Sequence, residues 1–315
     1  MTTIVQAVSY GGPEVLQLTE VELAPPGPGE VEIEVRAAGV NPIDTKVYSG
    51  LMGADPAALP KRLGFEAAGV VTAVGPDALG PEGPVAVGDE VIAFRIDGAY
   101  ADRVVVPADA VIPKPAALGW PEAAGLMLTG ATAVHLLTAT AVDADDTVLI
   151  HGGSGGVGLM AIQLAVLRGA RVIATASTRK HADLVALGAE AVAYGDGLLE
   201  RIRALAPDGI DVALDLIGTD EALDTSLSLV ADRGRIATIA NFGAGPAAGI
   251  KVLGGGPGAD AGTEVRMAAR AELARLAGTG ELKVQVGNTF ALADVADAHR
   301  LLIAGGATGK IVLLP

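Results

Sequence analysis

A glycine-rich turn between a predicted strand and a predicted helix constrains this chain more than any other stretch. In TVLIHGGSGGVGLMAIQLA (147–165), the glycines separate a short apolar run from an apolar helical run. Such a turn lets the backbone approach a pyrophosphate, and the N-terminus of the following helix offers free N–H groups and a positive dipole end. The strand, turn and helix together predict a dinucleotide site. The alternative is a turn that binds nothing. The residues that fit G-x-G-x-x-G are Gly153, Ser154, Gly155, Gly156, Val157 and Gly158.

From residue 147 onward, strand-like and helix-like runs alternate, which predicts a doubly wound parallel sheet. The expected strands are 147–152, 171–176, 190–195, 211–218 and 235–240, and the expected helices are 158–169, 179–188 and 263–278. The segment 243–262 is rich in Gly and Ala, and we read it as loop, strand (250–253) and loop. The tail 293–315 predicts a helix and a last strand.

The first 115 residues have a different pattern, of short alternating or apolar runs broken by Gly and Pro. They predict an antiparallel β-rich domain with strands at 31–40, 67–75 and 88–94 and two more within 100–115. A helix is expected at 120–138, because Pro121 and Glu122 are typical of a first helical turn. The fold class is therefore α/β, a β-rich domain plus a Rossmann-type domain.

Composition excludes several kinds of function. The net charge of −15 argues against nucleic acid and anionic lipid as partners. Without cysteine there can be no disulfide, thiol catalysis or thiolate metal site. The most apolar long window, 155–176, is interrupted by Gln163, Arg168 and Arg171 and is a poor membrane span. We therefore expect a soluble, cytoplasmic protein that acts on a small molecule.

The residues after the strand 171–176 indicate which dinucleotide is bound. A carboxylate about 20 residues beyond the glycines would hold the ribose hydroxyls of NAD. Here Ala176 stands near that place, followed by Ser177, Arg179 and Lys180. A hydroxyl and an Arg or Lys suit a 2′-phosphate, so these residues predict NADPH. The alternative is a solvated helix start with two ordinary surface cations.

Several stretches, in this order, form one pattern: AAGVNPIDTKVYSG (37–50), LGFEAAGVVTAVG (63–75), GDEVIAF (88–94), LTGATA (128–133), the glycine turn and TGKIVL (308–313). Over essentially its whole length the chain resembles the zinc-independent quinone oxidoreductases of the medium-chain dehydrogenase/reductase superfamily. The resemblance implies a GroES-like catalytic domain (1–122 and 279–315) and a Rossmann NADP(H)-binding domain (123–278). It also implies an active site in the cleft between the two domains.

Zinc-using relatives carry Gly-His-Glu where this chain has Gly64-Phe65-Glu66. Phe65 cannot bind a metal, and the chain lacks the cysteines of the other ligand positions, so we expect no metal site. For Glu66 we expect a structural pairing with a backbone group or an Arg. The four histidines are scattered without ligand spacing, at His135, His151, His181 and His299.

The resemblance implies roles for further residues. Asn41 and Asp44 would line the cleft near the nicotinamide, where the Asn41 amide and backbone N–H groups could stabilise an enolate oxygen. Both residues could instead cap the helix that follows. Four other residues would contact the cofactor: Thr129 near its reactive ring, Tyr194 near the adenosine phosphate, and Asn241 and Phe242 on the nicotinamide side.

One departure from the family concerns the proton donor. Related reductases often have a Tyr shortly after the Gly that ends the NPID helix, where this chain has Leu51-Met52-Gly53. Tyr48 and Lys46 are near, so the donor is one of them, Asp44 through water, or solvent.

The implied activity is hydride transfer from NADPH to a quinone or an α,β-unsaturated carbonyl. One alternative is an enoyl or alkenal reductase of lipid or polyketide metabolism, and another is an NADPH-binding sensor with little turnover. The family also implies a homodimer paired through an edge strand at 249–253.

Overall fold

A computed structural model of the chain describes residues 1–256, 258–305 and 307–315. The chain forms two compact units: Met1–Leu128 with Arg270–Pro315, and Thr129–Ala269. The first division falls within the long helix α2 (Trp120–Ala139) and the second between α8 (Thr263–Ala268) and α9 (Arg270–Thr279). The expected boundaries at 122/123 and 278/279 therefore differ from the divisions of the contact pattern at 128/129 and 269/270.

The second unit is built around a six-stranded sheet whose strands are all parallel, in the order β13-β12-β11-β14-β15-β16. Its strands are β11 (Thr147–His151), β12 (Arg171–Ala176), β13 (Glu190–Ala193), β14 (Val212–Asp215), β15 (Ile236–Thr238) and β16 (Lys251–Val252). Its helices are α3 (Gly156–Leu167), α4 (His181–Ala186), α5 (Leu198–Leu205), α6 (Asp220–Leu229), α7 (Ala244–Ala247) and α8. The strand order reverses between β11 and β14, which is where a doubly wound sheet binds ligands.

Burial explains why these runs form parallel strands. Leu149, Ile173 and Ala213, from three neighbouring strands, are fully buried in one apolar cluster. A parallel sheet covered by helices needs such continuous apolar runs rather than alternation. The prediction of a Rossmann-type parallel sheet is confirmed.

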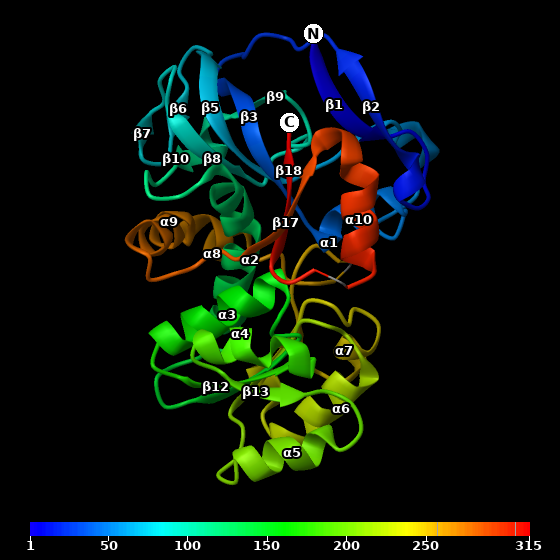
Figure 1. Cartoon of the computed structure of the whole chain (residues 1–315), viewed down its shortest axis with the longest axis vertical. Helices are drawn as coiled ribbons and strands as arrows, with labels where there is room; N and C mark the ends of the chain where they lie inside the picture. Colours follow the sequence, from blue (N-terminus) through cyan, green and yellow to red (C-terminus); the bar gives the residue numbers. More distant parts are fainter. Residues whose placement is uncertain (257, 306) are drawn as a thin grey trace. The chain divides into compact units, whose positions relative to one another are not determined.

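The first unit has one main sheet, in the order β10-β8-β5-β3-β18-β17, with β9 also paired to β3 and a second sheet β2-β1-β4. Its pairs are antiparallel except β17–β18. In Figure 1 the red β18 lies alongside the blue β3, so the last strand of the chain completes a sheet begun near its start. The prediction of an antiparallel β-rich domain is confirmed.

The bounds of this unit's elements are β1 (Thr2–Ala7), β2 (Leu16–Val21), β3 (Glu30–Val40), α1 (Pro42–Tyr48), β4 (Lys61–Arg62), β5 (Glu66–Val74), β6 (Leu79–Gly80), β7 (Gly83–Pro84), β8 (Glu90–Phe94), β9 (Arg103–Pro107), β10 (Val111–Pro113), α9, β17 (Val286–Ala291), α10 (Val295–Ile303) and β18 (Lys310–Leu314). Its short 3-10 helices are η1 (Pro13–Val15), η2 (Pro56–Ala58), η3 (Ala108–Ala110) and η6 (Leu292–Asp294), and those of the second unit are η4 (Thr178–Lys180) and η5 (Arg233–Arg235).

The single helix expected at 263–278 is wrong. The chain forms α8 and α9, separated at Ala269. The next residue, Arg270, is only 7% exposed and donates to the carbonyl of Asp109, 2.7 Å away. This contact between distant parts of the chain belongs to the first unit and is invisible to local helical periodicity.

Among the described residues, no helix combines the length and apolar character needed to cross a bilayer.

Candidate functional site

The glycine turn joins β11 to α3 and is tied to the neighbouring strand β12. Gly152 has φ +79°, a conformation that favours glycine, and its N–H donates to the hydroxyl of Thr175 at 3.1 Å. A Cβ on Gly158 would lie 2.5 Å from the Gly152 carbonyl oxygen and 2.6 Å from that of Gly153. The third glycine of the pattern therefore lets the helix start against the turn.

A Cβ on Gly155, by contrast, would meet nothing closer than 3.6 Å, and its φ of −77° is ordinary. No described residue requires glycine there, whereas a pyrophosphate close to the backbone would. The first turn of α3 also has N–H groups without helical carbonyl acceptors. These features fit a dinucleotide pyrophosphate at the start of α3.

The other expected cofactor residues of this unit, apart from Thr129, follow the carboxyl ends of neighbouring parallel strands. Ser177 follows β12, Tyr194 follows β13, and Asn241 lies three residues beyond the end of β15. Carboxyl ends of parallel strands meet at one edge of the sheet, so these side chains share the edge with the glycine turn. Thr129 lies elsewhere, on α2, where it is 4% exposed.

The two cations after β12 differ in exposure. Arg179 is exposed and forms no ion pair with any described residue. Lys180 is only 8% exposed, and burial lowers its pKa. Ser177 precedes them, half-buried, with no hydrogen bond from its side chain to the turn that follows. Arg179 and Ser177 are thus better placed than Lys180 to contact an external phosphate.

Side chains at the ends of β14 and β15 form a hydrogen-bonded chain. Thr238 donates its hydroxyl to Asp215 Oδ2 at 2.8 Å, and the Asn241 N–H donates to the Thr238 hydroxyl oxygen at 2.9 Å. Asn241 Oδ1 in turn accepts from the N–H of Ala244 at 2.9 Å. This chain holds the segment of Asn241 and Phe242 at the ligand-binding edge.

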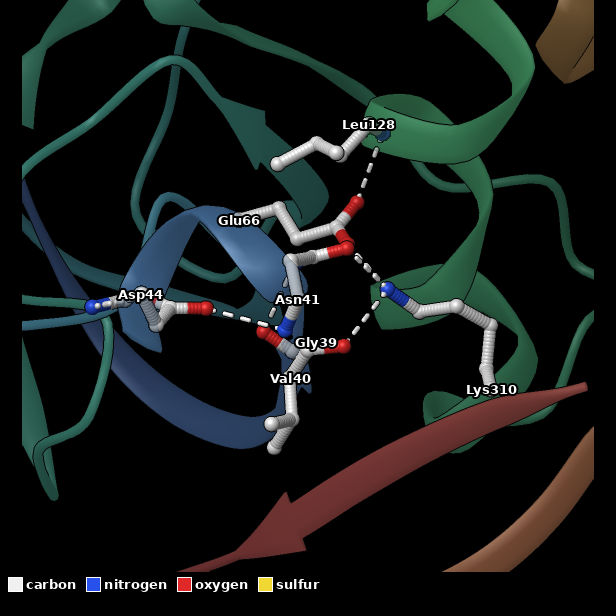
Figure 2. Close-up of polar contacts among 8 residues, drawn as sticks. Gly39, Val40, Asn41, Asp44, Glu66, Leu128 and Lys310 are labelled. Atoms are coloured by element: carbon white, nitrogen blue, oxygen red, sulfur yellow. Dashed lines mark hydrogen bonds and ion pairs between the residues drawn. The ribbon is translucent and has the colours of Figure 1, made fainter. Parts of the chain in front are cut away.

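A second cluster of polar side chains is buried in the first unit, around Glu66 (Figure 2). Glu66 is 0% exposed, and its Oε2 accepts the N–H of Leu128 on α2 at 2.8 Å. Its Oε1 accepts from Lys310 Nζ on β18 at 2.8 Å and from Asn41 Nδ2 at 3.0 Å. A Cβ on Gly39 would lie 2.4 Å from Oε1, so glycine is required beside this carboxylate. The expected pairing of Glu66 with a backbone group is confirmed, and its cation is a lysine rather than an arginine.

Asn41 lies in this cluster with its amide fully used. Nδ2 donates to the carbonyl of Gly39 at 3.1 Å as well as to Glu66, and Oδ1 accepts from Lys310 at 2.6 Å. An amide has two N–H donors, and the ammonium group of Lys310 identifies the oxygen. Both N–H groups of the Asn41 amide are therefore engaged within the protein, and the expected role of this amide toward a substrate oxygen stays a prediction.

Asp44 holds α1 to the following loop. Its Oδ2 accepts the N–H of Asn41 at 2.9 Å, as expected for a helix start, and its Oδ1 accepts that of Gly64 at 3.1 Å. Burial raises the pKa of Asp44 to about 7, against the lowering effects of the Tyr100 hydroxyl and the two N–H groups. The capping interpretation of Asp44 is confirmed.

Tyr48 lies in the apolar core of the first unit and is 1% exposed. Its hydroxyl is 3.2 Å from Nδ1 of the buried His299, and the two rings meet edge to face. Burial, with the charges of Asp44 and Glu14, raises the pKa of Tyr48 to about 12. The Tyr48 hydroxyl is therefore turned into the protein and is a weak acid, while its role as proton donor stays a prediction.

Sequence reasoning missed Lys310 and Gly39. Lys310 belongs to the quoted TGKIVL, where a charge at the start of a buried strand was the available signal. Gly39 gave no such signal, because the groups that require glycine there, the Glu66 carboxylate and the Ala124 carbonyl, come from distant parts of the chain.

The comparisons agree with this architecture. The family described as "Alcohol dehydrogenase GroES-like domain" matches residues 27–116, and the family described as "Zinc-binding dehydrogenase" matches residues 156–254. The chain is 36% identical to a quinone oxidoreductase of Pseudomonas aeruginosa, over 100% of both chains.

Solved structures are similar over the same length. The quinone oxidoreductase of Escherichia coli complexed with NADPH is 31% identical, with a TM-score of 0.87 over 99% of this chain and 100% of that one. The CurK enoyl reductase is 26% identical, with a TM-score of 0.87 over 99% of both.

A GroES-like domain joined to a Rossmann domain with this glycine turn defines a medium-chain dehydrogenase/reductase. Within that superfamily, the full-length identity shows that the chain belongs to the quinone oxidoreductase family.

The zinc named in one family description does not fit the residues present. Phe65 offers no ligand atom, and both oxygens of Glu66 already accept hydrogen bonds. In the part of the chain that the structure describes, no group of three or more His, Cys, Asp or Glu side chains is arranged to hold a metal ion.

Proposed function

We propose that this protein is an NADPH-dependent quinone oxidoreductase. The observation that carries the cofactor choice is the end of β12, where Ala176 replaces an acid and Ser177 and the exposed Arg179 follow. A carboxylate there would repel a 2′-phosphate, whereas a guanidinium binds phosphate oxygens through two parallel N–H groups. The full-length similarity to quinone oxidoreductases supports the choice of acceptor.

Each group at the edge of the Rossmann sheet has a role in this proposal. The glycine turn and the first turn of α3 bind the pyrophosphate, and Ser177 and Arg179 hold the 2′-phosphate. Tyr194, 60% exposed, contacts the adenosine end, while Asn241 and Phe242 contact the nicotinamide end. NADPH, when bound, supplies the hydride, and the protein supplies position and electrostatics.

The second candidate is a double-bond reductase, favoured by the similarity to the CurK enoyl reductase. Such a reaction needs a proton as well as a hydride. In the first unit Tyr48 faces His299 inside the core, and the Asn41 amide is committed to Gly39 and Glu66. Quinone reduction depends less on a positioned acid, so this arrangement favours the quinone reading.

The first experiment follows NADPH oxidation with a quinone and with an α,β-unsaturated aldehyde, and identifies the organic products. We expect hydroquinone as the main product and slow or no formation of saturated aldehyde. Saturated aldehyde as the faster product would favour the double-bond reductase. Tight NADPH binding without turnover of either compound would favour a sensor.

The cofactor choice is tested with Arg179→Ala. We expect its NADPH affinity to fall roughly 10- to 100-fold while NADH affinity stays within about twofold, because a charged hydrogen bond to the 2′-phosphate is lost. Both dissociation constants are measured by fluorescence titration. Arg203→Ala, an exposed arginine on α5, is the matched control. Equal losses for both cofactors would contradict the proposal.

The proposal also includes a cytoplasmic location, because the enzyme needs a pool of free reduced cofactor. It further includes a homodimer. Strand β16 is the last named strand of the parallel sheet, and edge strands are where the sheets of two chains can pair. Light scattering should give twice the chain mass of 31.3 kDa, and a monomer mass would exclude the dimer.

A further inference from the structure

Two glycines that follow β16, Gly254 and Gly256, lie close to the ring of Phe242. A Cβ on Gly256 would lie 2.4 Å from Cδ1 of the Phe242 ring, and one on Gly254 would lie 3.9 Å from its Cζ. Only a bare backbone can come this close to the ring at Gly256. The residues 254–256, which we call the glycine wall, therefore lie against an aromatic side chain at the ligand-binding edge.

Asp260 ties this wall to the sheet through its backbone. Its N–H donates to the carbonyl of Val252 at 2.9 Å, and its own carbonyl accepts the N–H of Gly254 at 2.7 Å. Just after β16, the Leu253 N–H donates to the carbonyl of Thr238 at the end of β15. The wall is thus an extension of the sheet beside the residues that precede Phe242.

The side chain of Asp260 connects the wall to α2. Its Oδ1 accepts the N–H of Gly262 at 2.9 Å, and its Oδ2 lies 3.2 Å from Nε2 of His135. His135 is 2% exposed, and a Cβ on Gly262 would lie 2.3 Å from its ring. Gly262 also has φ +56°, so the turn is shaped to admit the imidazole.

The neighbours of His135 define its tautomer. Arg266 Nε donates to Nδ1 at 3.3 Å, and Arg266 Nη1 donates to the hydroxyl of Thr132 at 3.1 Å. A guanidinium has no acceptor, so Nδ1 is unprotonated and Nε2–H donates to Asp260. Burial, with the charge of Arg266, lowers the pKa of His135 despite the nearby carboxylate. The neutral ring therefore gives one directed hydrogen bond to the wall at pH 7.

We propose that His135 is a positioning residue for dinucleotide binding, which holds Asp260 and thereby keeps the glycine wall and Phe242 at the carboxyl edge of the sheet. This inference rests on the proposed NADPH site and assigns to it a residue that lies outside the glycine turn. Because the wall bounds the nicotinamide side rather than the 2′-phosphate, His135 acts on NADPH and NADH alike.

The test replaces His135 with Phe, which keeps the ring volume and removes both hydrogen bonds. We expect the dissociation constants of NADPH and NADH to rise together, by about tenfold. KM for NADPH should rise similarly, while kcat at saturating NADPH stays within about twofold. Hydrogen exchange should accelerate at the amides of Gly254, Asp260 and Gly262, which the anchor protects. His135→Gln, whose amide can donate to Asp260, should recover most of the affinity.

Two further variants keep the test decisive. Asp260→Ala removes the same hydrogen bond from a side chain that is 67% exposed, so it should fold and show the same rise in both constants. Glu264→Gln, exposed on the neighbouring α8, should change nothing.

Unchanged affinities in both His135→Phe and Asp260→Ala would overturn the inference, even if hydrogen exchange accelerates. A wild-type protein that binds neither cofactor would overturn the proposed function instead. A loss confined to NADPH would also count against the inference, because it would implicate the 2′-phosphate.

Discussion

The glycine turn of the Rossmann domain and the Asn41–Glu66–Lys310 cluster of the GroES-like domain are both closely packed, but they are assembled differently. In the turn, Gly158 packs on the carbonyls of Gly152 and Gly153, a few residues away. In the cluster, Lys310 reaches Glu66 across 244 positions of the chain. The turn depends on local backbone sterics, whereas the cluster depends on the pairing of β18 with β3.

This difference predicts how each region fails when it is altered. Side chains added to the turn disturb a backbone shape and the ligand site beside it. Removing one partner of the cluster leaves a buried charge without its counter-charge. This lowers the free energy of unfolding by more than a side chain added to the turn does. The following changes test that contrast, from the largest expected effect to the smallest.

Lys310→Met should have the largest effect. It leaves the fully buried Glu66 without its cation, which costs about 3–5 kcal/mol in the free energy of unfolding. Urea unfolding followed by the fluorescence of Trp120, the chain's one tryptophan, measures the loss. Glu66→Gln added to Lys310→Met should recover part of it.

The control for this change is Arg36→Met, which breaks the exposed pair of Arg36 with Glu34. Exposed pairs contribute about 0–1 kcal/mol, so this variant should unfold almost like the wild type. Similar losses in Lys310→Met and Arg36→Met would show that the cluster is no more stabilising than a surface ion pair.

Two alanine substitutions separate the structural from the ligand-binding glycines of the turn. Gly158→Ala should lower the free energy of unfolding by about 1–3 kcal/mol, because its Cβ would clash with two carbonyls. Gly155→Ala should leave unfolding within about 0.5 kcal/mol of the wild type yet weaken NADPH binding, because space is open there until a pyrophosphate arrives. Thermal unfolding and NADPH titration of both variants are the measurement. NADPH affinity unchanged in Gly155→Ala would remove the pyrophosphate from this turn.

His299 gives the GroES-like domain a dependence on pH. Burial lowers its pKa from 6.5 to about 4, so between these values the unfolded chain binds a proton that the folded chain excludes. Its contribution to stability is therefore present above pH 6.5 and is lost as the pH falls toward 4, by at most about 1.4 kcal/mol per pH unit. Asp44, with its raised pKa, acts in the opposite direction between pH 4 and 7.

His299→Gln isolates the pH-dependent contribution of His299 to stability, because Asp44 contributes equally in the wild type and in the variant. The difference in unfolding free energy between wild type and variant should shrink as the pH is lowered from 6.5 to 4. A difference that is constant over this range would mean that His299 is not buried neutral.

The sequence predicted both domain types, because each has a local signature. Apolar runs and glycines around residue 150 indicated a parallel sheet, and the alternation at 31–40 indicated a half-exposed antiparallel strand, observed as β3. The helix expected at 263–278 is divided at Ala269 into α8 and α9, next to Arg270, whose guanidinium contacts the distant Asp109. Helical periodicity cannot register such a contact.

In the candidate site, too, the sequence predicted features with a local signature and missed contacts between distant residues. Residues that follow strands, such as Ser177 and Tyr194, reach the ligand edge because a parallel sheet brings all its carboxyl ends together. The partners of Asn41 and Tyr48 are Lys310 and His299, which come from the far end of the chain, so no local pattern could predict these contacts.

By itself, the sequence determined the parallel sheet, its glycine turn and the missing acid after β12, since these follow from local sterics, burial and charge. Only the tertiary structure decided which polar groups are satisfied: that Lys310 neutralises Glu66, that Tyr48 faces inward, and that His135 holds Asp260. A hydrogen bond needs its two atoms within about 3 Å. Which distant residues come that close is decided by how strands and helices pack, not by their order in the chain.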